Sequence, residues 1–464
     1  MQATLRIAPE NRMHAEPHTI AELARALETR ELTAERATSL CLDAIADRNP
    51  ALNAFITVLA DEARAQARQA DAEIAAGRYR SPLHGVPISL KDLFDVAGVS
   101  TTAASRVRTN HVARTDAAIV QRLRAAGAVF VGKNNLHEFA LGTTNEDSAF
   151  GPARHPLDVN RSPGGSSGGS AAAVLAGMAY ASIGTDTGGS IRIPAAACGL
   201  VGLKPALGEV PTDGVVPLSA TLDHVGPICR SVGDARILYG ALRGELGPLS
   251  ASARGIRGIR LGLLREYFTT LLDSEVASSF QGACARLQEA GVEFCDATIP
   301  HAGDIVAVYV HIVLSEAAAY HAATLERRPD DYTPDVRLRL ETGRYILAED
   351  YVRALRGRDL LRMEVDRALE GCDGLFLPTL PVTAPRLGVE TVRVGESDQP
   401  VRNVMLRLTQ LFNITGHPVM TLPCGSTAEN LPVGAQIVGS HEGTAALLEL
   451  AETLEPYLGP GASR

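Results

Sequence analysis

Two short segments place serine among glycines, each at the start of a helical pattern. Residues 161–170 read RSPGGSSGGS, with Ser166 near the centre, and residues 184–192 read GTDTGGSIR, with Ser190 after two glycines. Glycine lets the backbone approach a ligand closely, and consecutive N–H groups at a helix start can stabilise a developing oxyanion. Each segment can therefore offer a hydroxyl beside amide donors. Taken alone, each also fits a structural turn, a helix N-cap or a generic anion-binding nest.

The spacing of the two serine segments indicates that both can contribute to one site. Ser166 and Ser190 are 24 residues apart, and a helix followed by a strand separates them, so both can return to one site. No GxxxxGK[ST] is present, which excludes a phosphate-binding P-loop. Residues 164–168 also fit GxSxG, the nucleophile elbow of α/β hydrolases. That alternative requires a downstream catalytic histidine, and no histidine stands in a distinctive motif.

Lys91 follows an apolar run, HGVPISL, that predicts a buried strand over residues 84–90. Burial disfavours the ammonium form, and bringing a lysine pKa of about 10.4 down to 7 takes roughly 4 kcal/mol. A surface pair with Asp92 is the alternative. Only three of the 44 basic residues are lysines, Lys91, Lys133 and Lys204. Codon bias explains most of that skew, but only lysine can act as a neutral amine.

These three segments resemble the amidase signature family, strongly over most of residues 18–240 and in outline beyond. The spacing of 75 residues from Lys91 to Ser166 is similar as well. The resemblance implies Ser190 as nucleophile, Ser166 as a bridging serine after a cis peptide, and Lys91 as base. It also implies an oxyanion hole formed by the backbone N–H groups of Thr187, Gly188, Gly189 and Ser190. The resemblance further implies that the substrate pocket is lined by Leu141, Gly142 and Thr143. We further expect Asp186 to pair with Arg192 and hold the Ser190 loop.

Alternating apolar and helical patterns predict an α/β fold, in which helices cover both faces of a mixed central β-sheet. Thr19 and Glu22 form a capping box that predicts a helix, and Gly77 is a plausible helix stop. A long helix is expected near 335–371 and a surface loop at 388–401. The other expected elements are helices over 20–47, 59–76, 115–127 and 170–180, and strands over 128–133, 182–186, 259–264, 292–299, 374–379, 419–423 and 434–439.

The length of 464 residues leaves room for a large core. We expect an N-terminal tail over 1–17 and a single large amidase domain over 18–464. Within it, about 70–240 forms the catalytic core, and 250–464 completes the sheet and forms the pocket wall. The least periodic part, about 300–400, is expected to form a cap or that wall.

Composition excludes several classes of protein. The net charge is −9 and no basic stripe occurs, which argues against nucleic-acid binding. No apolar run reaches the roughly 18–20 residues of a membrane span, and no secretory signal is evident. Seven scattered cysteines without CxxC predict reduced thiols and a cytoplasmic location. His137-Glu138 is no HExxH, so neither a metal nor a cofactor is expected.

The sequence therefore predicts a stand-alone serine hydrolase that cleaves amides, anilides or carbamates, with an aryl-acylamidase or urethanase as specific options. Its expected partner is a small-molecule amide or carbamate, and the resemblance allows a homodimer. One alternative is the A subunit of a tRNA-dependent glutamine amidotransferase, from which residues 305–350 depart. The others are a Ser-His esterase and a binding protein with a vestigial site, although all three triad positions are filled.

Overall fold

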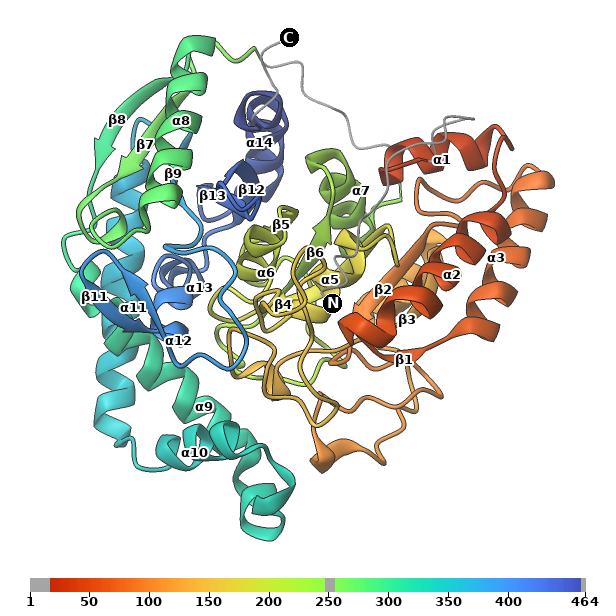
Figure 1. The fold of residues 1–464 in the computed structure, drawn as a ribbon, viewed down its shortest axis with the longest axis horizontal. Helices are drawn as coiled ribbons and strands as arrows, with labels where there is room; N and C mark the ends of the chain where they lie inside the picture. Colours follow the sequence, from red (N-terminus) through yellow and green to blue (C-terminus); the bar gives the residue numbers. More distant parts are fainter. Residues whose placement is uncertain (1–16, 247–254, 460–464) are drawn as a thin grey trace.

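Strands from both halves of the chain join in one sheet in the computed structural model, which describes residues 17–246 and 255–459. The strands are β1 (Phe55–Val58), β2 (Pro87–Lys91), β3 (Val129–Asn134), β4 (Ala181–Asp186), β5 (Val201–Lys204), β6 (His224–Cys229), β7 (Arg260–Leu264), β8 (Glu293–Ala297), β9 (Gly374–Pro378), β10 (Thr391–Val394), β11 (Ser397–Pro400), β12 (Val419–Ser426) and β13 (Pro432–Val438). Eleven of them form a sheet in the order β1-β3-β2-β4-β6-β5-β12-β13-β9-β7-β8, and β10 pairs with β11 (Figure 1).

The α-helices follow the same chain order. They are α1 (Ile20–Glu28), α2 (Ala34–Leu52), α3 (Ala60–Ala75), α4 (Ala118–Ala126), α5 (Gly168–Leu175), α6 (Arg192–Ala197), α7 (Val232–Arg243), α8 (Ser274–Ala290), α9 (Ile305–Arg327), α10 (Pro334–Gly343), α11 (Ala348–Leu369), α12 (Val401–Leu406), α13 (Leu411–Thr415) and α14 (Thr444–Leu458). Short 3-10 turns lie at Arg106–Arg108, Glu138–Ala140, Glu266–Phe268, Ala302–Asp304 and Pro329–Asp331.

The sheet is mixed and carries apolar cores on both faces. β2 runs parallel to β3 and β4, whereas β12 runs antiparallel to β5 and β13. Along β9, Phe376 belongs to the core that includes α2, α3, α7, α8 and α14, while Leu375 and Leu377 belong to the core that includes α9 to α13. Successive strand residues point to opposite faces, so helices cover both sides. The predicted α/β fold with a mixed central sheet is confirmed.

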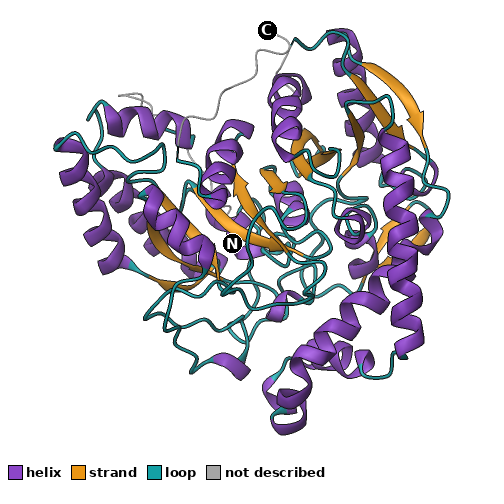
Figure 2. Ribbon diagram, turned by 180° about the vertical axis from the view of Figure 1, so that it is seen from behind, coloured by secondary structure: helices purple, strands orange, loops and turns teal. Residues whose placement is uncertain are grey.

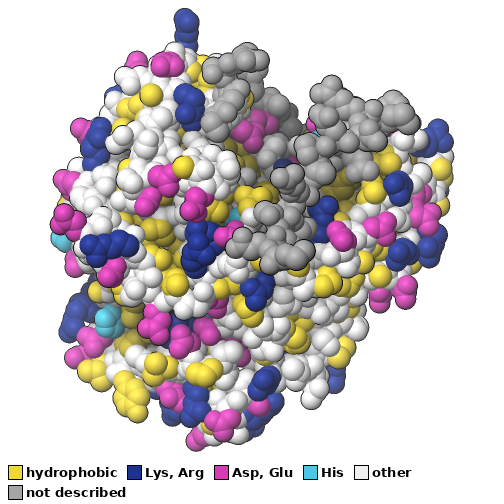
Figure 3. All heavy atoms as spheres, in the orientation of Figure 1, with side chains coloured by type: hydrophobic (Ala, Val, Ile, Leu, Met, Phe, Trp, Pro, Cys, Tyr) yellow, Lys and Arg dark blue, Asp and Glu magenta, His cyan; other side chains and the backbone are white. Residues whose placement is uncertain are grey.

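The parallel strands β2 and β4 determine the position of the candidate catalytic residues. Their carboxyl ends, Lys91 and Asp186, lie at the same edge of the sheet because the two strands are neighbours and run in one direction. Figure 2 shows loops gathered in the lower middle of the molecule, beyond the strands. On the face drawn in Figure 3, acidic and basic side chains are interspersed.

Several predicted elements are confirmed. Thr19 caps α1 with the full capping box, and Gly77, with φ of +75°, follows α3. The strands expected at 259–264, 292–299, 374–379, 419–423 and 434–439 appear as β7, β8, β9, β12 and β13 within three residues at each end. Most of the predicted tail, residues 1–16, lies outside the described residues.

Other predicted elements differ from the structure. The interrupted helical pattern over 20–47 corresponds to two helices, α1 and α2, whereas the single long helix expected near 335–371 is wrong, because this stretch forms two helices, α10 and α11. Both α10 and α11 pack on α9, so the chain turns between them to stay on that helix. The expected loop at 388–401 contains the hairpin β10–β11. The region 300–400, expected to lack periodic order, is largely helical.

Helix α9 is long and apolar enough to resemble a membrane span, although the sequence analysis expected no such segment. Together with the preceding 3-10 turn it spans Ala302–Arg327, with a mean hydropathy of 1.4 in its most apolar window, and is long and apolar enough to cross a membrane. However, 50% of that window is buried within the protein, and α9 packs against α10, α11 and α13. That is the packing of a core helix, and it accounts for the apolar composition.

Candidate active site

Lys91 is the last residue of β2, at the centre of one half of the sheet. β2 lies between β3 and β4, and all five of its residues are buried. The side chain of Lys91 is 0% exposed, and its Nζ lies 2.7 Å from Ser166 Oγ and 2.8 Å from Thr185 Oγ1. Among the described residues, the amine therefore contacts two hydroxyl groups and no carboxylate.

Burial lowers the pKa of Lys91 from 10.5 to about 7. The carboxylates of Asp186 and Asp223 act in the opposite direction and recover only part of that change. Desolvation disfavours the charged amine, and neither carboxylate is close enough to form an ion pair with it. A large share of the Lys91 side chains is consequently neutral near pH 7 and able to accept a proton.

The alternative of a surface pair between Lys91 and Asp92 is wrong. Asp92 Oδ1 lies 2.7 Å from Lys133 Nζ, and both of these side chains are 0% exposed. Asp92 also accepts the N–H of Thr102 at 2.9 Å, while Lys133 donates to Thr101 Oγ1 at 2.7 Å. Asp92 therefore pairs with Lys133, and Lys91 has no counter-ion within residues 17–246 and 255–459.

Ser166 lies in the Gly/Ser-rich loop before α5. The Gly165–Ser166 peptide bond is cis, the geometry that the resemblance implies for this serine. A Cβ on Gly165 would lie 2.9 Å from backbone atoms of Thr143 and Thr144, so only glycine fits there. Ser166 O accepts the N–H of His137 at 3.1 Å. The loop that presents Ser166 is thus fixed by segment 137–145.

Ser190 lies between β4 and α6. Gly189, with φ of +138°, could not be replaced, because a Cβ there would come within 2.3 Å of Thr409 Oγ1. Ser190 O accepts the N–H of Ser167 at 3.2 Å, which joins the two serine segments. The Ser190 side chain is 6% exposed, and its hydroxyl forms no hydrogen bond within the described residues. That hydroxyl is free to meet a substrate.

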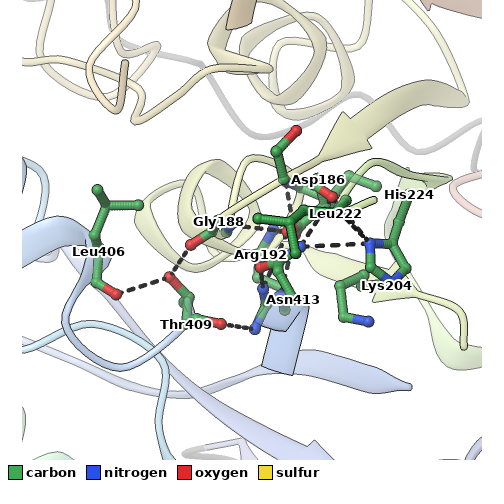
Figure 4. Close-up of polar contacts among 12 residues, drawn as sticks. Asp186, Gly188, Arg192, Lys204, Leu222, His224, Leu406, Thr409 and Asn413 are labelled. Carbon is green, nitrogen blue, oxygen red and sulfur yellow. Dashed lines mark hydrogen bonds and ion pairs between the residues drawn. The ribbon is translucent and has the colours of Figure 1, made fainter. Parts of the chain in front are cut away.

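The predicted pairing of Asp186 with Arg192 is confirmed, and it anchors the Ser190 loop (Figure 4). Arg192 Nε and Nη2 each lie 3.0 Å from the Asp186 carboxylate, and both side chains are 0% exposed. Asn413 adds a hydrogen bond to Asp186 Oδ1 at 2.8 Å and accepts one from Arg192 at 2.6 Å. Burial alone would raise the pKa of Asp186, but Arg192 and Asn413 hold it well below its ordinary value.

Replacing Arg192 by methionine should lower the free energy of unfolding by about 3–5 kcal/mol, because Asp186 would remain buried without its partner. Denaturant unfolding followed by circular dichroism measures this loss. Arg353, which is 71% exposed and pairs with Asp350, is the matched control, and Arg353→Met should cost less than about 1 kcal/mol. Equal losses in the two variants would contradict the anchoring role.

One of the expected oxyanion donors is already used. The N–H of Gly189 donates to Asp186 Oδ1 at 2.8 Å, so it is not free for a ligand in this structure. Within the described residues, the N–H groups of Thr187, Gly188 and Ser190 have no acceptor. Of the four backbone N–H groups predicted for the oxyanion hole, these three are therefore available to a substrate in this structure.

The expected pocket residues divide into two groups. Gly142 and Thr143 line a cavity of about 490 Å³, together with Thr144 and His137. Leu141 does not line this cavity, because its side chain is buried in the apolar core on the α9 side of the sheet. The cavity adjoins the Ser166 loop through Thr143 and Thr144.

Two residues that contact the site escaped the sequence analysis. Thr185 Oγ1 contacts Lys91, and its place two residues before Thr187 on β4 is the sequence signal that could have identified it. Asp223 accepts the hydroxyl of Thr187 at 2.6 Å. Burial raises the pKa of Asp223 to about 6, against its hydrogen bonds and the charge of Lys91. No motif in the sequence marks Asp223.

No imidazole hydrogen bonds to Ser166 or Ser190 in the part of the chain that the structure describes. His224 is buried close to the Ser190 loop, but its Nδ1 lies 2.7 Å from Leu222 O and 3.2 Å from Asp186 O. The geometry therefore offers Lys91, and no histidine, as the base beside the serines. This disfavours the Ser-His esterase.

Comparisons with known proteins agree on one family. The model of the family described as Amidase matches residues 36–448. The A subunit of the glutamyl-tRNA(Gln) amidotransferase of Anaeromyxobacter dehalogenans (strain 2CP-C) is 40% identical over 453 residues, which cover 88% of this chain and 90% of that protein. An amidase of Pseudomonas putida is 41% identical over 428 residues, with 89% and 90% covered.

Solved structures extend this agreement to the fold. A crystal structure of an amidase matches with a TM-score of 0.89 and 37% identity, covering 95% of this chain and 100% of the other. A 6-aminohexanoate cyclic dimer hydrolase with bound substrate matches with a TM-score of 0.82 and 30% identity, covering 96% and 98%. This chain therefore belongs to the amidase signature family of hydrolases that act on carbon–nitrogen bonds.

Proposed function

We propose that this chain is a stand-alone serine hydrolase that cleaves the carbonyl C–N bond of small amides, anilides or carbamates through an acyl-enzyme on Ser190. The observation that carries this proposal is the Lys91 amine, fully buried and 2.7 Å from Ser166 Oγ, with a pKa lowered by burial to about 7. A neutral amine in that position can act as a general base, which an ordinary surface lysine cannot do at pH 7.

The proposed reaction moves one proton along a short relay. Neutral Lys91 accepts the proton of Ser166, and Ser166 accepts that of Ser190, whose oxygen attacks the carbonyl carbon. The N–H groups of Thr187, Gly188 and Ser190 stabilise the resulting oxyanion. The C–N bond breaks, the leaving nitrogen takes the proton back through Ser166, and an acyl-enzyme remains. Water then attacks the acyl group along the same path and releases the acid.

Thr185 and Asp223 have supporting roles in this proposal. Thr185 Oγ1 is a second contact for Lys91 Nζ at 2.8 Å, and it fixes the direction of the amine toward Ser166. Asp223 holds Thr187 and places a negative charge near Lys91, which partly offsets the effect of burial on the lysine pKa. Neither residue need react with the substrate.

A turnover screen of the purified chain tests the proposal. The panel contains p-nitroacetanilide, a p-nitrophenyl carbamate, aliphatic amides and the matching esters. Each compound is assayed with the purified chain alone, with no partner protein added. Turnover of at least one C–N substrate, with release of the amine, supports the proposal. Hydrolysis of esters alone, with every amide and carbamate intact, would overturn it.

A second candidate is the A subunit of a glutamine-dependent amidotransferase. The 40% identity to curated relatives of that name favours it, whereas the 41% identity to the Pseudomonas putida amidase favours independent action. The discriminating measurement is ammonia release from glutamine by the chain alone and after addition of the other amidotransferase components. Activity that appears only with those components and glutamine would select this candidate.

The pH dependence of turnover should report the protonation of Lys91. Because the neutral amine is the active form, kcat/KM should rise with pH and level off above an apparent pKa of about 7. Asp223→Asn removes a charge that favours the ammonium form, so the rise should move to lower pH. Asp47→Asn, at an exposed position on α2, is the control and should leave the profile unchanged. A pH-independent kcat/KM between 5 and 9 would contradict the assignment.

A further inference from the structure

Glu316, on α9, accepts hydrogen bonds from a turn that leads to the candidate active site. Its Oε2 accepts the hydroxyl of Ser219 at 2.6 Å and the N–H of Thr221 at 3.1 Å. Its Oε1 accepts the hydroxyls of Thr221 at 2.7 Å and of Tyr351 at 2.9 Å. Among the described residues, the Glu316 carboxylate forms no ion pair. Uncharged donors therefore hold it, and three of these four hydrogen bonds come from the turn at 218–223.

The same turn is closed on its other side by Asp223. The N–H groups of Leu218 and Ser219 donate to the Asp223 carboxylate, the first at 2.9 Å and the second at 3.2 Å. The N–H of Asp223 donates in return to Ser219 O at 2.9 Å. Ser219 is thus bound to Asp223 through its backbone and to Glu316 through its side chain. One residue therefore connects the two carboxylates.

Asp223 extends this connection to the candidate oxyanion hole. Its Oδ1 accepts the hydroxyl of Thr187 at 2.6 Å, and the Thr187 N–H is one of the three backbone donors available to a substrate. The strands β4 and β6 reinforce the contact, because Asp186 pairs with His224 in their register. Asp186 directly precedes Thr187, and His224 directly follows Asp223. A shift of the turn would consequently move Thr187 as well.

A carboxylate suits the position of Glu316 better than an amide does. Each of its oxygens accepts two hydrogen bonds, and an ionised carboxyl has lone pairs for all four. A glutamine amide would keep one acceptor oxygen and would place its own N–H donors against the remaining donors. Hydrogen bonds to a charged acceptor are also roughly twice as strong as neutral ones. Helix α9, which packs against α10, α11 and α13, is therefore a firm support for the turn.

We propose that Glu316 is a positioning residue for the oxyanion hole. Through Ser219 and Asp223 it fixes Thr187, so that the Thr187 N–H is already in place when the oxyanion forms. Donors fixed in advance stabilise the charge that develops in the transition state and add little to binding of the uncharged substrate. Glu316 should therefore affect kcat and the binding of tetrahedral analogues, and it should leave substrate binding almost unchanged. This inference rests on the proposed hydrolase function and adds a residue of α9 to its machinery.

Steady-state kinetics of Glu316→Gln test this role. We expect kcat to fall about 5- to 30-fold with KM within about twofold, a smaller loss than the 10²- to 10³-fold typical of removing an oxyanion donor outright. Glu364→Gln is the matched control. Glu364, on α11, is 5% exposed and accepts the N–H of His301 at 3.0 Å, outside the 218–223 turn, so this variant should keep both constants. Equal losses of kcat in the two variants, or a change in KM alone, would overturn the positioning role.

Calorimetric titration with phenylboronic acid gives a readout that needs no turnover, because this acid forms a tetrahedral adduct with a serine oxygen. Its affinity should fall about 5- to 30-fold in Glu316→Gln, whereas p-nitroacetanilide should bind Ser190→Ala and Ser190→Ala/Glu316→Gln equally. A selective loss of boronate affinity supports the positioning role even in a chain that hydrolyses no compound. Equal weakening of both ligands, or no weakening of either, overturns it while leaving the hydrolase intact.

Ser219→Ala gives a second, independent variant, because it removes only the hydroxyl that donates to Glu316. If both residues act through the same turn, the double variant Glu316→Gln/Ser219→Ala should lose little more boronate affinity than Glu316→Gln alone. Denaturant unfolding of each variant confirms that the protein compared is folded. Losses that simply add, or a Ser219→Ala variant with unchanged boronate affinity, would contradict transmission through Ser219.

Discussion

Replacing Ser190 by alanine is expected to lower kcat by roughly 10⁴- to 10⁶-fold, the loss typical of removing the nucleophile from a serine hydrolase. Among the residues that the structure describes, the hydroxyl forms no hydrogen bond, and it lies on the loop that the Asp186–Arg192 pair anchors. The folded structure should be unaffected, because the Ser190 backbone contact to Ser167 does not involve the lost oxygen. Steady-state kinetics on the best substrate of the screen measures the change.

Ser170 provides a matched control for Ser190. It belongs to the Gly/Ser-rich segment and is 0% exposed, and its hydroxyl has no hydrogen-bond partner in the described part of the chain. Ser170→Ala should therefore keep nearly full activity. Phenylmethylsulfonyl fluoride should label the protein once, at Ser190, and mass spectrometry of peptides locates the adduct. A label on Ser167, or turnover by Ser190→Ala above about 1% of the unmodified protein, would refute the nucleophile assignment.

The spacing of residues along the sequence could predict which polar residues lie close together, because neighbouring parallel strands end at the same edge of a sheet. Lys91 ends one parallel strand, and Ser190 follows the end of its neighbour, so both reach the same sheet edge. The scarcity of lysine was informative as well. Lys91, Lys133 and Lys204 are all 0% exposed, and burial lowers the pKa of each. A chain that uses arginine elsewhere has kept lysine at three interior positions.

Contacts between distant segments could not be predicted in the same way. Nothing local to Asp92 reveals that Lys133, on the adjacent strand, takes its charge. The contact between Asp186 and Gly189 is local, but the sequence does not show it either, because it depends on how the loop turns the Asp186 carboxylate toward the Gly189 N–H. Helix α9 was missed within the region 300–400 because it carries few charged residues, and such a helix lacks the polar stripe that reveals periodicity.

Replacing Lys91 by arginine is expected to be almost as damaging as replacing it by alanine, with at least a 10³-fold loss of kcat/KM in either case. General-base catalysis contributes about 10²- to 10⁴-fold, and a guanidinium cannot give up its proton in a protein. Both variants thus lack the acceptor for the proton of Ser166. Single-turnover kinetics with an activated anilide measures the loss in the acylation step.

The arginine variant also separates two readings of this lysine. If Lys91 served only as a positive charge that holds the Ser166 loop, arginine would keep that role, and Lys91→Arg would retain activity with an unchanged pH profile. If it is a base, the rise near pH 7 disappears along with the activity. Lys133→Arg is the matched control, since a permanent cation can still pair with Asp92, and it should keep most of its turnover if denaturant unfolding shows a folded protein. Equal losses at Lys91 and Lys133 would mean that burial of a larger side chain, and not the chemistry of the amine, causes the defect.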